Sequence, residues 1–181
     1  MNKFPLKKLV NLAIKKPALA MLLIVVIALS QLVEFPMTGA DSDTGMCEVN
    51  SVYDGDTMRV TCNGKKTKIR LYCIDTPEME QRPWGTESRD FLRSLTPANV
   101  TLKAYDTDRY GRLVAEVFVG SRNLNLAMVE HGQASVYSRY CKKQAYFDKQ
   151  QLAQKNNIGI WSKPGLQQEP WNWRRQKHAS K

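Results

Sequence analysis

The sequence predicts a small domain of the α+β class, mainly β, in which five strands close into a barrel and three helices accompany them. Three observations predict this fold. Short runs in which apolar and polar residues alternate indicate half-buried strands. Turn residues separate these runs, and three other segments carry apolar residues at helical spacing. With 181 residues, the chain has room for one such domain and a short targeting segment.

Residues 1–35 predict a hydrophobic signal or anchor helix ahead of this domain. Lysines precede an apolar run that starts at Pro17, which is typical of membrane insertion or export. A cleaved signal peptide would use Thr38-Gly39-Ala40, an imperfect site, whereas a retained anchor needs roughly 20 apolar residues. Because the lysines stay in the cytoplasm, both versions place the domain outside it: secreted, periplasmic, or anchored to the membrane and facing outward.

Residues 36–45 are rich in Gly, Pro, Ser, Thr and Asp, and we expect them to form a linker before a domain over residues 46–163. The segment Cys47 to Ile74 predicts a three-stranded meander. Asp54-Gly55 indicates a two-residue hairpin loop, and Asn63-Gly64 marks the next turn. On the third strand, Ile69, Leu71 and Cys73 share one face and Arg70 lies on the other.

The later elements follow from the same two periods. The sequence predicts a first helix over Thr86 to Leu95, a fourth strand at Val100 to Ala104 and a fifth at Leu113 to Val119. A second helix runs from Leu124 to His131, where Gly132 suits a left-handed cap, and a third covers Gln144 to Lys155. Five strands with a helix after the third favour a barrel of the OB type, and an open α+β sheet is the alternative.

The four cysteines all follow the linker: Cys47, Cys62, Cys73 and Cys141. Their spacing does not resemble a zinc site, and outside the cytoplasm an even number favours disulfides. If Asp54-Gly55 forms the hairpin loop, Cys47 lies opposite Cys62, within disulfide reach. Cys73 would then pair with Cys141 by elimination. Four buried, reduced thiols are the alternative.

The net charge of +10 belongs to the domain more than to its leader. Residues 1–46 carry five lysines against three acidic groups, so 22 basic and 14 acidic residues remain for the rest. A basic domain attracts polyanions, which favours nucleic acid as a partner. The alternatives are affinity for anionic lipid and a charge that serves solubility alone.

Three short segments carry the candidate chemistry: Asp54 to Thr57, Ile69 to Glu78, and Asp108 to Arg112. Asp56, Asp75 and Glu78 are carboxylates at a turn and at a strand end, and a hard cation such as calcium prefers such oxygen ligands. Pro77 restricts the backbone of Thr76, which directs the Thr76 carbonyl toward a metal. A carboxylate beside a metal-bound water is available as a general base.

Arg70 and Arg112 complete the candidate centre. Two guanidinium groups that converge on one phosphate neutralise the charge that develops during its hydrolysis. Each segment alone has a plainer explanation: a hairpin turn, a helix start, or a basic loop. Their combination points to a phosphodiesterase.

Together these segments resemble the staphylococcal nuclease (thermonuclease) family, over most of the domain from about Cys47 to Ser162. Trp84-Gly85-Thr86-Glu87 at the first helix, Asn123 to Gly132, and Asn157 to Ser162 extend the likeness. The resemblance implies an OB-fold barrel with three helices that uses calcium to hydrolyse phosphodiester bonds of DNA and RNA. It implies these roles: metal ligands Asp56, Asp75 and Thr76; general base or water-positioning group Glu78; phosphate-binding Arg70 and Arg112; substrate-binding Tyr110 and Tyr137.

Two departures touch substrate contacts. The loop between Glu78 and Trp84 is short, and Ser135 stands where the best-known member has a second substrate-contacting tyrosine. An alternative function is a non-catalytic OB-fold module that only binds nucleic acid, although such a module has no need for the full set of carboxylates and arginines.

Residues 164–181 form a basic, aromatic tail that contains Trp171, Trp173 and Arg174. It suits nucleic-acid stacking, a membrane interface, or a loose terminus that packs one Trp on the domain. We expect a monomer that contacts the membrane only through an uncleaved N-terminal segment.

Overall fold

Five strands form a closed barrel in the computed structural model, which describes residues 43–180. They are β1 (Asp43–Val52), β2 (Thr57–Cys62), β3 (Lys65–Leu71), β5 (Asn99–Thr107) and β6 (Leu113–Val119). All neighbours are antiparallel except β3 and β6, whose parallel pairing from Ile69↔Leu113 to Leu71↔Ala115 closes the sheet. The structure therefore has the closed barrel that the sequence predicts, and not the open sheet.

The β1–β2 connection differs from the predicted two-residue hairpin. Tyr53 N–H donates to the Thr57 carbonyl across a three-residue loop. The register changes between Val49 and Ser51, and this β-bulge absorbs one residue. Because the bulge compensates for the longer loop, Cys47 and Cys62 still meet, and they form a disulfide. The predicted pairing is confirmed, although the loop on which it was based is wrong.

The β2–β3 turn is as predicted, with Asn63 and Gly64 both at positive φ, as a two-residue hairpin of type I′ requires. Cys73 and Cys141 form the second predicted disulfide, which joins positions 68 residues apart. This bond lies beside a small second sheet, in which β4 (Ile74–Asp75) pairs with β8 (Ser135–Val136).

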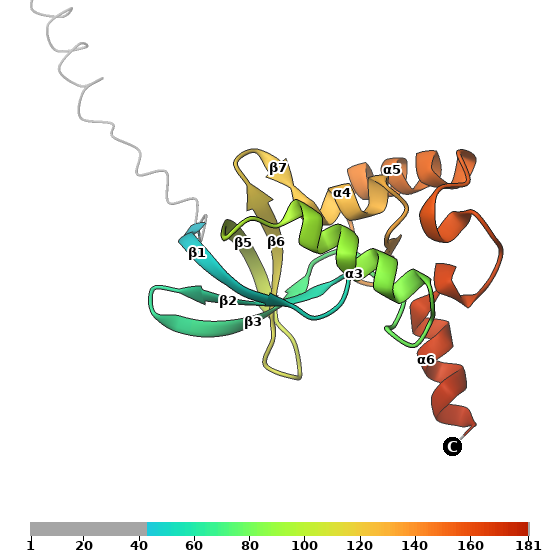
Figure 1. The fold of residues 1–181 in the computed structure, drawn as a ribbon, viewed down its shortest axis with the longest axis horizontal. Coiled ribbons are helices and arrows are strands. Elements are labelled where there is room, and N and C mark those ends of the chain that lie inside the picture. Colours follow the sequence, from blue (N-terminus) through green and yellow to red (C-terminus); the bar gives the residue numbers. More distant parts are fainter. Residues whose placement is uncertain (1–42, 181) are drawn as a thin grey trace, which may run out of the picture. The chain divides into compact units, whose positions relative to one another are not determined.

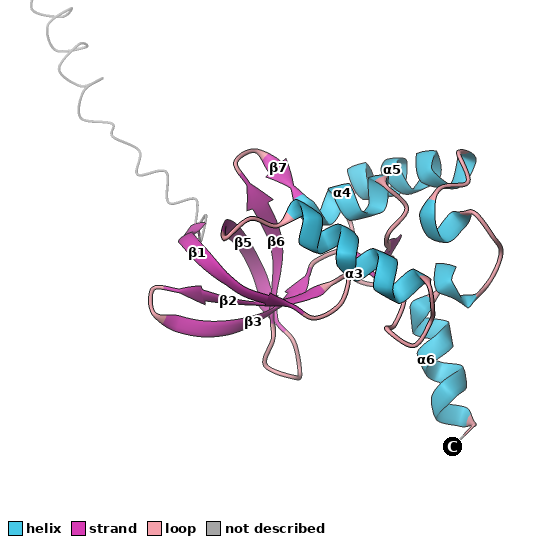
Figure 2. Cartoon of the chain, in the orientation of Figure 1, coloured by secondary structure: helices cyan, strands magenta, loops and turns pink. Residues whose placement is uncertain are grey.

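Four α-helices occur among residues 43–180, and Figures 1 and 2 show them gathered on one side of the barrel. They are α3 (Trp84–Leu95), α4 (Leu124–Glu130), α5 (Gln144–Lys155) and α6 (Pro170–Ala179). A two-residue strand, β7 (Arg122–Asn123), precedes α4, and the 3₁₀ turns η1 (Gly159–Trp161) and η2 (Leu166–Gln168) precede α6.

The fourth helix corrects the prediction of three. It lies in the tail 164–181, where Pro170 takes the first helical position, as proline often does. β1 begins at Asp43, inside the segment 36–45 for which the sequence predicts a linker. The predicted signal or anchor helix at residues 1–35 lies outside the described residues. Within residues 43–180, no helix is long and apolar enough to cross a membrane.

The core fills the barrel and continues beneath α3 and α4. Alternate residues of β2 and β3 supply Met58, Val60, Ile69 and Leu71, all fully buried, which confirms the predicted alternation. Gly132 follows α4 at positive φ, as predicted. It lies so close to η1 that a Cβ atom would be 2.3 Å from the Ile158 carbonyl oxygen, so only glycine fits there.

A buried carboxylate connects the barrel to α5. Glu116 is 2% exposed and accepts hydrogen bonds from the Tyr146 hydroxyl (2.6 Å), the Tyr105 hydroxyl (2.7 Å) and Lys143 Nζ (2.7 Å). Burial alone would raise the pKa of Glu116, but these hydrogen bonds outweigh it and lower the pKa. The carboxylate is thereby kept ionised and ties β5, β6 and α5 together.

Candidate active site

The β1–β2 loop positions the first candidate carboxylate. The Asp54 side chain accepts a hydrogen bond from the Asp56 amide at 3.0 Å, and the Asp56 carbonyl accepts one from Leu71 N–H at 2.8 Å. Gly55, between them, packs on α3, where a Cβ atom would lie 1.9 Å from Ser88 Oγ. Gly55 is therefore needed for this close approach, and not for the two-residue turn that the sequence indicated.

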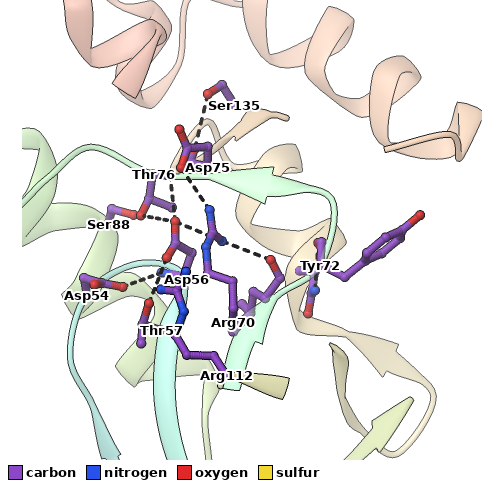
Figure 3. A network of polar contacts seen from close by, with 12 residues as sticks. Asp54, Asp56, Thr57, Arg70, Tyr72, Asp75, Thr76, Ser88, Arg112 and Ser135 are labelled. Atoms are coloured by element: carbon purple, nitrogen blue, oxygen red, sulfur yellow. Dashed lines mark hydrogen bonds and ion pairs between the residues drawn. The ribbon is translucent and has the colours of Figure 1, made fainter. Parts of the chain in front are cut away.

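Arg70 lies between the two carboxylates Asp56 and Asp75, as Figure 3 shows. Its Nη1 is 3.1 Å from Asp56 Oδ2, and its Nη2 is 2.9 Å from Asp75 Oδ1. Asp75 is fully buried, and Asp56 is nearly so. The polar face of β3 thus brings together three of the predicted site residues around one point.

Thr76 is also part of this cluster, through groups other than the carbonyl that the sequence suggested. Its N–H and its hydroxyl both donate to Asp56 Oδ2, each at 3.1 Å. Asp75, the residue before Thr76, is held in place by the second sheet. It pairs with Ser135, whose hydroxyl donates to the Asp75 carbonyl at 3.2 Å. Ser135 is buried here and supports the site from behind.

The electrostatics of the cluster are those of crowded, desolvated acids. Burial raises the pKa of Asp75 to about 6, and the nearby Asp56 adds to this effect, while Arg70 and Arg174 oppose it. Burial and the same neighbour raise the pKa of Asp54 to about 7. Carboxylates this close together repel each other, so a positive charge between them is stabilising.

Glu78 is held by contacts that the sequence did not reveal. Its N–H donates to Gln81 Oε1 at 2.9 Å, and its carbonyl accepts from Gln81 N–H at 2.8 Å. At the start of α3, a Cβ atom on Gly85 would lie 2.1 Å from the Glu78 carbonyl oxygen. In the sequence, only Gly85, next to Trp84, indicated that the chain packs closely at this point.

The side chain of Glu78 is bound by a residue of the C-terminal helix. Arg174 Nη1 lies 2.8 Å from Glu78 Oε1, and Arg174 Nη2 lies 2.8 Å from Asp75 Oδ2. Burial alone would lower the pKa of Arg174, but these two carboxylates raise it. The sequence placed Arg174 in a basic, aromatic tail but did not predict the helix that brings it to Asp75 and Glu78.

Arg112 is positioned by the β5–β6 turn and is bound to Asp108 rather than to the Asp56–Asp75 pair. Its Nε lies 2.7 Å from Asp108 Oδ2, while the other oxygen of Asp108 accepts the amides of Tyr110 and Arg112, both at 2.9 Å. Burial would raise the pKa of Asp108, but the bonds from Arg112 and Tyr110 lower it. Asp108 thus keeps its charge and orients Arg112.

The two candidate substrate tyrosines lie in different surroundings. Tyr110 is 68% exposed, and the guanidinium groups of Arg109 and Arg112 lie over its ring. Tyr137 stacks on Trp171 of α6, with ring centroids 5.8 Å apart and planes at 17°. The backbone of Tyr137 is fixed as well, because its N–H donates to the Cys73 carbonyl at 2.8 Å.

The oxygen-rich donor set suits a hard cation. Asp56 and Asp75 come from different elements, are both buried and lie on either side of Arg70, so positive charge is already placed between them and a cation fits the same charge. Over residues 43–180 there is no cluster of three or more His, Cys, Asp or Glu side chains around one point. Backbone oxygens and water would therefore complete the ligand shell, as is common for calcium.

The chain is similar to known nucleases. A family model described as "Staphylococcal nuclease homologue" matches residues 68–163. An "Uncharacterized endonuclease" of Haemophilus influenzae is 36% identical, over 77% of this chain and 79% of its own length. A "Micrococcal nuclease" of Shigella flexneri is 34% identical, over 71% of this chain and 79% of its own length. "Endonuclease YncB" of Bacillus subtilis is 31% identical, over 62% of this chain and 59% of its own length.

Proposed function

This chain belongs to the staphylococcal nuclease family of hydrolases, and on that premise we propose that it cleaves DNA and/or RNA with calcium as its cofactor, outside the cytoplasm. The observation that carries the proposal is the convergence of Asp56 and Asp75 on Arg70, with all three side chains largely shielded from solvent. This pairing of acids with an arginine provides for a cation and a phosphate side by side.

Each residue of the cluster has a task in this account. Asp56 and Asp75 hold the cation, and Thr76 orients Asp56 through two hydrogen bonds. Bound calcium would supply positive charge that polarises the phosphate and acidifies a bound water. Arg70 lies where it can exchange its ion pairs with the two carboxylates for hydrogen bonds to a phosphate oxygen, and such charge-assisted bonds strengthen as charge develops in the transition state.

Glu78 and Arg112 act on either side of the phosphate. Glu78 accepts the proton of the attacking water, and Arg112, oriented by Asp108, stabilises the developing charge. We expect Glu78→Gln and Arg112→Ala each to lower kcat by orders of magnitude while circular dichroism and the melting temperature stay near those of the wild type. Near-normal rates in both variants would remove these roles.

The polar face of β2 and β3 supports a polyanionic substrate. Three pairs lie directly opposite each other along it: Thr57 and Arg70, Arg59 and Lys68, Thr61 and Lys66. Arg59 and Lys68 both lie over the ring of Tyr53, although like charges in opposed positions repel each other. A nucleic-acid strand that leaves the phosphate at Arg70 along this face would relieve that repulsion and stack on Tyr53.

The proposal of action outside the cytoplasm rests on the two disulfides and on the sequence of residues 1–35. Disulfides persist in oxidising compartments and are rare in the cytosol. Fractionation of cells that express the full chain, together with N-terminal sequencing and thiol counting, tests this part. Recovery in the cytosol with four free thiols would contradict it.

Controlled digestion tests the activity itself. The purified protein is incubated with denatured DNA and, separately, with RNA, first with calcium, then with excess chelator, then with calcium restored. We expect cleavage that stops with chelator and returns with calcium. Cleavage that chelator does not affect would exclude the metal, and no cleavage of either polymer would contradict the proposed function.

A further inference from the structure

The C-terminal helix α6 contacts the active site through one of its faces. Trp171, Arg174 and Lys177 are spaced three residues apart, so they lie along the same side of the helix. Trp171 stacks on Tyr137, Arg174 binds Asp75 and Glu78, and Lys177 binds Glu80. Three consecutive contacts from one helical face indicate a docked segment.

Arg174 binds the carboxylates that the chemistry requires. Asp75 uses one oxygen for Arg70 and the other for Arg174, so neither oxygen of this fully buried group is without a hydrogen bond. The same guanidinium binds Glu78, which is the proposed general base. A guanidinium donates hydrogen bonds but accepts none, so it can replace the charge of a cation without activating water.

Trp171 contacts the residue that is proposed to bind the substrate, Tyr137. Its ring lies nearly parallel to that of Tyr137, so it covers the aromatic surface on which a nucleobase would stack. Helix α6 therefore contacts both Asp75, which is proposed to hold the cation, and Tyr137, which is proposed to stack on a nucleobase. The connection before the helix is anchored, because the buried Gln167 donates to the carbonyls of Ile160 and Lys163.

We propose that α6 is an autoinhibitory segment: Arg174 competes with the metal ion for Asp75 and with the attacking water for Glu78, and Trp171 competes with the substrate for Tyr137. The inference rests on the proposed function, since it concerns the same carboxylates. Metal and nucleic acid together displace α6, so the nuclease is least active where divalent cations are scarce. By linkage, whatever weakens the docking of α6 strengthens metal binding to the same degree.

The closing experiment measures calcium binding, without substrate, by titration calorimetry on the full chain. Arg174→Gln removes the competitor, and Arg175→Gln is the matched control, with the same charge change at an exposed position of the same helix. If wild-type α6 covers the site roughly 90% of the time, Arg174→Gln lowers the apparent Kd for calcium about tenfold. Arg175→Gln should leave the Kd near that of the wild type.

Two further measurements make the outcome decisive. Lys177→Gln loosens the outer end of the same helix and should lower the Kd in the same direction by a smaller factor. Calcium should also change the fluorescence of the wild-type tryptophans as Trp171 leaves Tyr137, and this change should be smaller in Trp171→Phe. An unchanged or weaker affinity in Arg174→Gln would overturn the proposal.

Cleavage assays separate this inference from the function on which it rests. If α6 inhibits, Arg174→Gln cleaves DNA faster than the wild type at limiting calcium, and the difference disappears at saturating calcium. If Arg174→Gln binds calcium no more tightly while both proteins cleave DNA, only the autoinhibition is wrong. If neither protein cleaves in any amount of calcium, the proposed function itself fails.

Discussion

Gly55 packs so closely against Ser88 that a Cβ atom would lie 1.9 Å from the serine hydroxyl oxygen. We expect Gly55→Ala to push the loop away from α3 and move Asp56 relative to Asp75, which would lower kcat about 100-fold, since misplacement by about 1 Å is that costly. Gly45→Ala is the control, because no atom lies within 4 Å of its added Cβ. Equal kcat values for the two variants would show that the loop adapts.

The two disulfides should differ in what they support. Cys73–Cys141 closes a chain segment of 68 residues and Cys47–Cys62 one of 15, so their loss should cost about 4 and about 3 kcal/mol of stability. Cys73 is also only two residues before Asp75. Paired serine variants, measured by denaturant unfolding and by kcat below both melting temperatures, should show a kcat loss only for Cys73/Cys141. A loss confined to Cys47/Cys62 would contradict this.

Glu116 predicts a specific pH dependence of stability. Its pKa in the folded protein is lowered from the ordinary value of 4.5, so its stabilising effect is full above that pH and is lost as the pH falls through the folded value. We expect Glu116→Gln to cost about 2 kcal/mol at pH 7. The difference from the wild type should narrow below pH 4.5.

The control for that comparison is Glu130→Gln, which removes a surface pair with Lys149 and should cost less than about 1 kcal/mol. Urea unfolding at several pH values provides the measurement. A wild-type advantage over Glu116→Gln that stays constant from neutral to strongly acidic pH would show that the Glu116 carboxylate is not the cause.

Lys68 should act on substrate affinity without acting on chemistry. If the substrate follows the polar face of β2 and β3 as proposed, Lys68→Gln would remove one phosphate contact, so KM for single-stranded DNA should rise, kcat should stay unchanged, and the salt dependence of binding should weaken by about one unit of slope. Arg122→Gln makes the same charge change at an exposed position of β7. An identical salt slope in the wild type and in both variants would place the substrate elsewhere.

Much of the barrel could be predicted because its signals are local. The alternation in β2 and β3, the Asn63-Gly64 turn and the bounds of β6 and α5 all follow from neighbouring residues. The β-bulge in β1 could not be predicted, because it is a feature of the pairing between β1 and β2 and not of a local residue pattern. The cysteine pairing was nevertheless correct, since the bulge offset the error in loop length.

The site divides in the same way. Asp56, Arg70, Asp75 and Thr76 were predicted from motifs, and the structure brings them together. Gln81 and Arg174 were missed, because their roles depend on contacts with residues distant in space or in sequence. The docking of Arg174 required a fourth helix, for which Pro170 after Glu169 was the only local signal.

The central claim is that Asp75 and its partners form a metal-dependent nuclease centre. Its most direct test is the calcium-dependent cleavage rate of Asp75→Asn, with Asp148→Asn as an exposed control on α5. The account predicts that Asp75→Asn binds calcium more weakly and loses nearly all cleavage, while Asp148→Asn cleaves as the wild type does. Undiminished, chelator-sensitive cleavage by Asp75→Asn would contradict it.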